Sequence, residues 1–132
     1  MIQIFDCDQG TPEWHACRLG IPTASRFADV LAKGEGKTRA RYLRDLATET
    51  IRGSVEEDTY SNAHMERGKV MEDEARRMYA FMADAEPVRV GFIRDGRKGC
   101  SPDALIGDDG GLEIKTALGQ IQVQRLQKGG LP

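Results

Sequence analysis

The sequence predicts a single domain of mixed α/β class, with helices in its first part and strands after them. Before Pro87, capping and breaking residues mark helix ends, and between residues 71 and 82 apolar residues recur at spacings of three and four, which is typical of helices. After Pro87, Val88, Val90 and Phe92 alternate with other residues, which favours a strand. The chain has 132 residues, a length that suits one domain, and we expect that domain to span residues 1–132.

Four helices are expected before Pro87, each bounded by residues that cap or break helices. Thr11 and Pro12 begin the first helix, because Thr is a good N-cap and Pro suits the first helical position. The expected helices cover residues 11–18, from 23 or 25 to 32, 38–51 and 61–82. In the last of these we expect an apolar stripe formed by Met71, Ala75, Met78, Tyr79 and Met82.

Three strands and a last helix are expected in the rest of the chain. The strands cover residues 88–93, 104–106 and 112–116, and the helix covers residues 118–127. Asp108 to Gly111 is expected to form a hairpin turn, because an Asp-Gly pair favours tight turns between strands. We therefore expect a small mixed sheet that follows the N-terminal helices and precedes a C-terminal helix.

The composition excludes several classes of protein. No apolar run approaches the roughly 18 residues of a membrane span, and the start of the chain lacks the features of a signal peptide. The three cysteines form no CxxC pair, so we expect neither a zinc site nor a disulfide framework, and we expect a cytoplasmic protein without a membrane. Because the net charge is −2, attraction to DNA would need bound cations or a local basic segment. Residues 33–52 are such a segment, or else a solvated helix face.

The residues best suited to chemistry are Asp103, Glu113 and Lys115. Alternation along a strand would place Glu113 and Lys115 on one face, and the hairpin would bring Asp103 beside them. Two carboxylates can hold Mg²⁺ with the Ile114 carbonyl as a further ligand, and Lys115 can orient or deprotonate an attacking water. This set suits phosphodiester hydrolysis, although Glu-Ile-Lys also occurs on ordinary solvated strands.

Two further candidates are weaker from the residues alone. Glu72 lies at the edge of the apolar stripe, where a simple helical pair with Arg76 is the favoured interpretation. Arg18 with a hydroxyl such as Ser25 at a helix N-terminus can make an anion site suited to phosphate. The alternative there has Trp14 in the core, Arg18 on the surface and Ser25 as a cap.

Four motifs in order connect these candidates. They are Trp14-x3-Arg18-x-Gly20 with Thr23-Ala24-Ser25, Gly68-x3-Glu72 with Ala75-Arg76, Cys100-Ser101-Pro102-Asp103, and Gly111-Leu112-Glu113-Ile114-Lys115. With these motifs the sequence resembles the phage lambda exonuclease family, also described as YqaJ-like viral recombinases, of the PD-(D/E)xK nuclease superfamily. The resemblance implies a restriction-endonuclease-like fold and Mg²⁺-dependent digestion of one strand of double-stranded DNA from its 5′ end, with Mn²⁺ as a substitute.

The resemblance also implies roles for individual residues. Asp103, Glu113 and the Ile114 carbonyl would hold the metal, Lys115 would assist the water, and Glu72 would act through the metal or its water. The terminal 5′-phosphate would be held by Arg18, Ser25 and Ser101. The implied partners are double-stranded DNA ends, a single-strand annealing protein and further copies of the chain.

The chain departs from the family in its length. Family members continue past the position of Pro132 into a glutamine-rich motif, helices and strands, so we expect a C-terminally shortened domain that self-associates and cleaves weakly. Two alternatives therefore stay open, which are a catalytically silent DNA-end-binding or assembly module, and an endonuclease or junction resolvase of the same fold.

Overall fold

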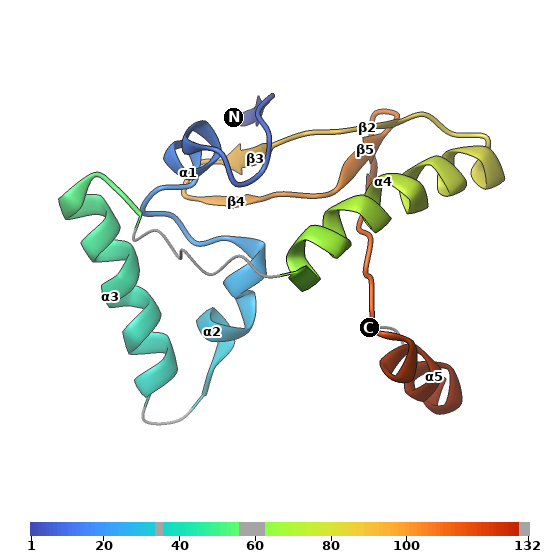
Figure 1. Ribbon diagram of the computed structural model, residues 1–132. Helices are drawn as coiled ribbons and strands as arrows, with labels where there is room; N and C mark the ends of the chain where they lie inside the picture. The colour runs from blue at the N-terminus through green and yellow to red at the C-terminus, as the bar shows by residue number, and fades with distance from the viewer. Residues whose placement is uncertain (34–35, 56–62, 130–132) are drawn as a thin grey trace.

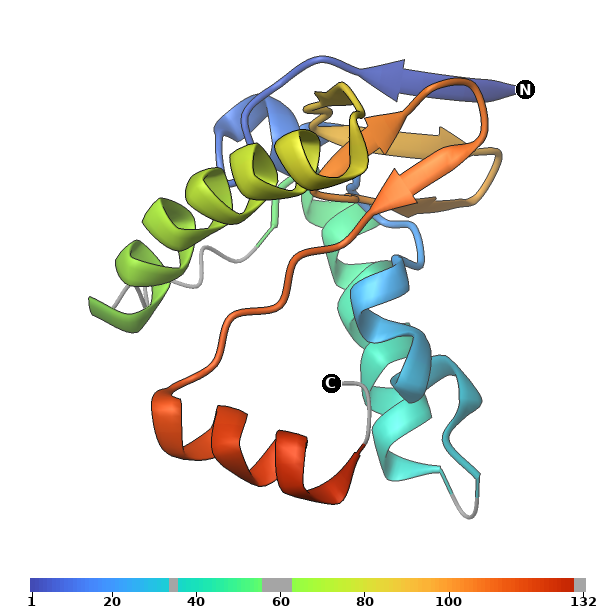
Figure 2. The same ribbon diagram turned by 90° about the vertical axis from the view of Figure 1, so that its right-hand side faces the viewer.

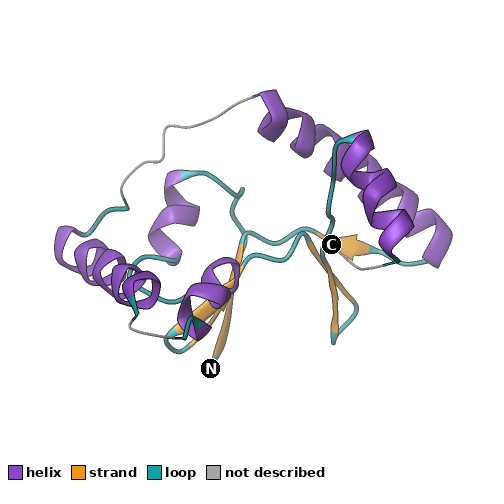
Figure 3. Ribbon diagram, turned by 90° about the horizontal axis from the view of Figure 1, so that it is seen from below, coloured by secondary structure: helices purple, strands orange, loops and turns teal. Residues whose placement is uncertain are grey.

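The computed structural model describes residues 1–33, 36–55 and 63–129 of the chain (Figure 1). Its elements follow in the order β1 (Ile2–Phe5), α1 (Pro12–Cys17), a 3₁₀ turn η1 (Ala24–Arg26), α2 (Phe27–Leu31), α3 (Lys37–Arg52), α4 (Ala63–Ala83), β2 (Pro87–Val88), β3 (Phe92–Asp95), β4 (Lys98–Cys100), β5 (Ala104–Ile106), β6 (Gly110–Leu112) and α5 (Gly119–Lys128). Helices and strands alternate in groups, which confirms the mixed α/β class. Seen from below, the helices lie in two groups on either side of the strands (Figure 3).

The helices form where the sequence predicts them, because local signals determine their ends. The Thr11 hydroxyl accepts a hydrogen bond from the Trp14 N–H and caps α1, with Pro12 at the first helical position. Gly53 ends α3 in the left-handed conformation, with φ of 68°. The second helix is shorter than expected, since it begins as η1 and continues as α2. The expected cap at Ser61-Asn62 lies outside the described residues.

The strands form two antiparallel sheets where we expected one. Their orders are β1-β3-β4 and β2-β5-β6, so the single strand predicted for residues 88–93 is wrong. Gly91 lies at the break between β2 and β3. Its N–H donates to the Phe5 carbonyl, and a Cβ there would lie 2.2 Å from the Cys7 carbonyl oxygen. Only a residue without a side chain fits here, and at this point the chain passes from the sheet of β2 to the sheet of β3. Neither β1 nor β4 was predicted.

The last predicted strand, residues 112–116, is also wrong, because β6 ends at Leu112. In the β5–β6 hairpin Ala104 pairs with Leu112 and Ile106 with Gly110, around a turn at residues 107–109. Pro102 precedes this ladder and has no N–H to donate, so the backbone pairing cannot continue to residue 114. Residues 113–118 therefore leave the sheet as an extended segment that leads to α5 (Figure 2).

The core is centred on Phe92, which is completely buried. Its ring lies 6.4 Å from that of Phe5 and directly above Gly99, where an added Cβ would lie 2.2 Å from the ring. Gly99 also donates its N–H to the Pro22 carbonyl, which holds the segment before η1 against β4. The N-terminal helices are therefore attached to the first sheet through tight backbone contacts.

The apolar stripe predicted on α4 does not lie in the core. Met78 and Met82 are 59% and 77% exposed, and α5 has no buried residue. The physical reason is that no described element packs over this face of α4, and α5 stands apart at the end of the extended segment (Figure 2). Within the described ranges, no helix is long and apolar enough to cross a membrane.

Candidate active site and phosphate-binding pocket

Asp103 lies immediately before β5 and is held at two points by the opposite side of the hairpin. Its N–H donates to the Leu112 carbonyl over 3.0 Å, and its carboxylate Oδ2 accepts a hydrogen bond from the Ile114 N–H. The Asp103 carboxylate thus accepts the Ile114 N–H just after β6 ends, in place of a backbone carbonyl of the opposite strand. The local pairing fixes the Asp103 carboxylate beside the segment that carries Glu113 and Lys115.

Glu113 and Lys115 lie together, as predicted, although the strand expected to align them does not extend that far. The Lys115 ammonium donates to Glu113 Oε1, and both side chains are about half exposed. Glu113 also faces the segment before Asp103. Burial, and secondarily the Glu113 charge, raises the pKa of the Cys100 thiol. Neighbouring segments at one end of the hairpin therefore carry two carboxylates and an ammonium.

Glu72 is connected to this site through Arg76, which is buried and 8% exposed. The Arg76 Nη2 donates both to Glu72 Oε1 and to the Asp103 carbonyl oxygen, the latter over 3.3 Å. The predicted helical pair is confirmed, and it is also part of a contact between α4 and β5. The sequence identified Arg76 only as the partner of Glu72 and as a motif member, because its contact with Asp103 spans 27 positions.

The oxygen donors at this end of the hairpin suit a hard divalent cation. Among residues 1–33, 36–55 and 63–129, no three His, Cys, Asp or Glu side chains are grouped closely enough to hold a metal by themselves. Mg²⁺ commonly takes only one or two carboxylates and completes its shell with waters and substrate phosphate oxygens. Asp103 and Glu113, with the Ile114 carbonyl between Glu113 and Lys115, match that donor set.

Arg18 and Ser101, two of the residues expected at a phosphate site, are joined by Trp14. The Arg18 guanidinium lies 3.9 Å from the centre of the Trp14 ring. The indole N–H of Trp14 donates to Ser101 Oγ over 2.8 Å and to the Gly91 carbonyl over 3.1 Å. Trp14 was predicted only as a motif member or a core residue. Its spacing of four from Arg18 on a helix was the available signal for this contact.

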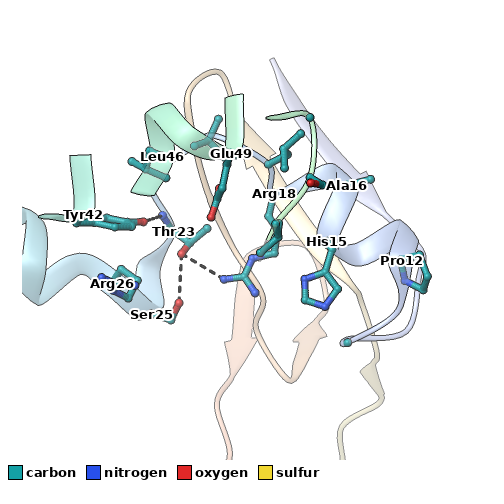
Figure 4. A pocket seen from close by; sticks show the side chains of 16 residues that line it. Pro12, His15, Ala16, Arg18, Thr23, Ser25, Arg26, Tyr42, Leu46 and Glu49 are labelled. Atoms are coloured by element: carbon teal, nitrogen blue, oxygen red, sulfur yellow. Dashed lines mark hydrogen bonds between the residues drawn. The ribbon is translucent and has the colours of Figure 1, made fainter. Parts of the chain in front are cut away.

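Ser25 joins the same group through Thr23. The Arg18 Nη2 donates to Thr23 Oγ1 over 3.4 Å, and that hydroxyl lies 3.2 Å from Ser25 Oγ (Figure 4). The Thr23 N–H donates to the buried Tyr42 hydroxyl, which fixes the start of η1 against α3. The sequence identified Thr23 only as a member of a motif and did not identify Tyr42, because the contacts of both depend on how η1 packs on α3.

A pocket of about 700 Å³ lies between α1, η1 and α3 (Figure 4). Its lining includes Arg18, Thr23, Ser25 and Tyr42, together with His15, Arg26 and Glu49. Burial lowers the pKa of the Arg18 guanidinium, while the nearby Glu49 carboxylate acts in the opposite direction. Glu49 accepts the Gly20 N–H over 3.0 Å, and Arg26 is paired with Asp29. Arg18 has no such carboxylate contact within hydrogen-bond distance among the described residues, so its charge is available to an anion.

The fold is similar to that of solved structures of an exonuclease. The chain is similar to the crystal structure of LHK-Exo in complex with dAMP, with 36% identity and a TM-score of 0.77, and to that of the alkaline exonuclease LHK-Exo from Laribacter hongkongensis, with 35% identity and a TM-score of 0.76. Each match covers 92% of this chain and 61% of the exonuclease chain. The fold is therefore that of an alkaline exonuclease, over somewhat less than two thirds of its length.

A match of the sequence to a family model identifies the family of this chain. Residues 13–132 match the YqaJ-like viral recombinase domain, and the chain belongs to that family. This confirms the resemblance drawn from the four motifs. A search of curated proteins gave no match.

Proposed function

We propose that this chain carries the catalytic core of a Mg²⁺-dependent 5′→3′ exonuclease that acts on double-stranded DNA. The main support is the short segment from Ser101 to Asp103. Ser101 accepts the indole N–H of Trp14, whose ring lies against the pocket residue Arg18, and Asp103 belongs to the acidic hairpin end. Two residues of extended chain span at most about 7 Å. In this proposal Ser101 and the acids are therefore close enough to contact neighbouring phosphates at the end of one DNA strand.

Each candidate residue has a chemical role in this proposal. Asp103, Glu113 and the Ile114 carbonyl would hold the metal, and Glu72 would act through the metal or its water. When bound, Mg²⁺ or its substitute Mn²⁺ lowers the pKa of a water and offsets the charge of the transition state. Lys115, now paired with Glu113, would orient the attacking water or take its proton.

The pocket would select the end of the strand. A terminal 5′-phosphate carries more charge than an internal phosphodiester, and Arg18 with the Ser25 and Ser101 hydroxyls offers charge-assisted donors for it. Such a contact fixes the strand by its 5′ end and gives the reaction its direction. The exposed cations of α3, Arg39, Arg41 and Arg44, are available to the DNA backbone.

The proposal extends to partners. We expect double-stranded DNA ends as substrate, a single-strand annealing protein that receives the exposed strand, self-association of the chain, and work in the cytoplasm of a bacterial host on host or phage DNA. The exposed apolar residues of α4 and α5, including Phe81 at 89% and Leu126 at 72%, support self-association. Sedimentation at several concentrations measures it, and a monomer at all concentrations would contradict this part.

A digestion assay tests the proposed function. We expect the chain with Mg²⁺ to shorten linear 5′-phosphorylated duplexes progressively, and Asp103→Asn and Glu113→Gln to abolish this because each removes a ligand charge while keeping the side-chain shape. Binding of duplex ends without loss of DNA would instead support a silent end-binding module. Cutting of closed circles would support an endonuclease or resolvase.

A further inference from the structure

Arg76 contacts three groups on two elements around the acidic hairpin end. Besides Glu72 and the Asp103 carbonyl, its Nη1 donates to Asp73 Oδ1 over 2.6 Å. Its side chain is only 9% exposed, whereas those of Glu72 and Asp73 are 29% and 56% exposed. The guanidinium therefore lies beneath the acids, on the side away from solvent, and joins α4 to the beginning of β5.

Burial of this cation has a cost that its position must offset. A buried charge is unfavourable unless it is paired and hydrogen-bonded. Arg76 has two carboxylates as partners, yet its Nε is buried without a partner among the described residues. A residue selected for stability alone would be expected to satisfy that donor. The arrangement instead satisfies the two terminal nitrogens, of which Nη2 is directed at Glu72 and the Asp103 carbonyl and Nη1 at Asp73.

We propose that Arg76 is a positioning residue that raises the divalent-cation affinity of the hairpin-end site by holding Glu72 at a fixed place relative to Asp103. This inference rests on the proposed function. One terminal nitrogen contacts both residues, so any shift of α4 along β5 would break one of the two hydrogen bonds. The carboxylates then keep their spacing before the cation arrives, and the cation has less ordering to impose.

Lysine cannot replace this contact. A guanidinium presents its donors in a rigid planar fork, whereas an ammonium is a single point on a flexible stem. Arg76→Lys keeps the charge but loses the simultaneous contacts with Glu72, Asp73 and the Asp103 carbonyl. Residues that orient metal ligands typically contribute about 10- to 100-fold to metal affinity. We therefore expect Arg76→Lys to bind Mn²⁺ about 10- to 100-fold more weakly than the unaltered chain.

The experiment is a calorimetric titration of the whole chain with Mn²⁺ in the absence of DNA, with the folded fraction of each variant checked by circular dichroism. Arg77→Lys is the matched control, because Arg77 is exposed and, among the described residues, donates only to the Asp73 carbonyl over 3.3 Å. We expect Arg77→Lys to bind as the unaltered chain does. Equal or tighter Mn²⁺ binding by folded Arg76→Lys would overturn the inference, whatever its effect on thermal stability.

A second variant keeps the test decisive if Arg76→Lys does not fold. Asp73→Asn alters an exposed side chain whose partner among the described residues is Arg76, so we expect it to fold and to weaken Mn²⁺ binding by a smaller factor. Unchanged binding there would also contradict the inference. If the proposed metal site itself is wrong, the result is different: the unaltered chain and Glu113→Gln would then bind Mn²⁺ equally.

Discussion

The Trp14 ring lies beneath the guanidinium of Arg18, 3.9 Å from ring centre to Cζ, and the same indole donates its N–H to Ser101, 87 positions away. A cation over an indole face is attracted by the ring quadrupole, most strongly where water is partly excluded. The contact with Ser101 fixes the plane of the ring, and the ring in turn fixes the guanidinium. Trp14 thereby joins Arg18 to Ser101, which are far apart in the sequence.

Arg18→Ala should reduce the preference for a 5′-phosphate. Charge-assisted hydrogen bonds are each worth about 1.5–3 kcal/mol, so we expect the ratio of cleavage rates on phosphate and hydroxyl ends to fall by about tenfold or more. Single-turnover rates on matched duplexes measure the ratio. Arg44→Ala, on the exposed part of α3, is the control and should keep it. An unchanged ratio in Arg18→Ala would place Arg18 outside end recognition.

Lys115→Ala should slow cleavage without preventing cation binding. A positioned acid–base group contributes about 10²- to 10⁴-fold to rate, and we expect a loss of that order. Lys115→Arg should not restore the rate, because a guanidinium does not give up its proton in proteins. Metal titration beside single-turnover kinetics separates the two effects. A full cleavage rate in Lys115→Arg would show that a positive charge next to Glu113 is sufficient for catalysis and that Lys115 does not transfer a proton.

Local signals in the sequence predicted the elements whose ends they control. Thr11 with Pro12 begins α1 and Gly53 ends α3, because cap hydrogen bonds and left-handed backbone depend on neighbouring residues only. β4 was missed for the converse reason. Lys98-Gly99-Cys100 contains no residue that favours strands strongly, and it is held by pairing with β3 and by the Pro22 carbonyl.

The candidate site was predicted in part, and the reasons differ from residue to residue. Glu113 and Lys115 lie together although the strand that would align them is absent, since their own ion pair draws them together. Trp14 and Arg76 could not be assigned from spacing alone. Their decisive contacts, with Ser101 and with the Asp103 carbonyl, are tertiary and arise only when α1 and α4 meet the loops around β5.

Gly91→Ala should destabilise the fold at the point where the two sheets separate. An added Cβ would lie 2.2 Å from the Cys7 carbonyl oxygen, which is backbone and cannot move aside freely. Overpacking of this kind costs about 1–3 kcal/mol in unfolding free energy. Gly111→Ala is the control, because a Cβ there meets nothing within 4 Å. Urea unfolding measures both, and equal stability of the two variants would contradict the close approach of Gly91 to Cys7.

Stability at alkaline pH should depend on Cys17. Burial, and next the neighbouring Cys7, raises the pKa of the Cys17 thiol from 9.0 to about 11. Between these values the unfolded chain releases the proton while the folded chain keeps it, so this thiol's contribution to stability is complete below pH 9 and falls as the pH rises toward 11. Cys17→Ser removes the titration, because a serine hydroxyl keeps its proton throughout this range. We therefore expect the unfolding free energy of the unaltered chain to fall more steeply from pH 8.5 to pH 10.5 than that of Cys17→Ser. Parallel curves from urea unfolding would show that the Cys17 thiol ionises equally in both states.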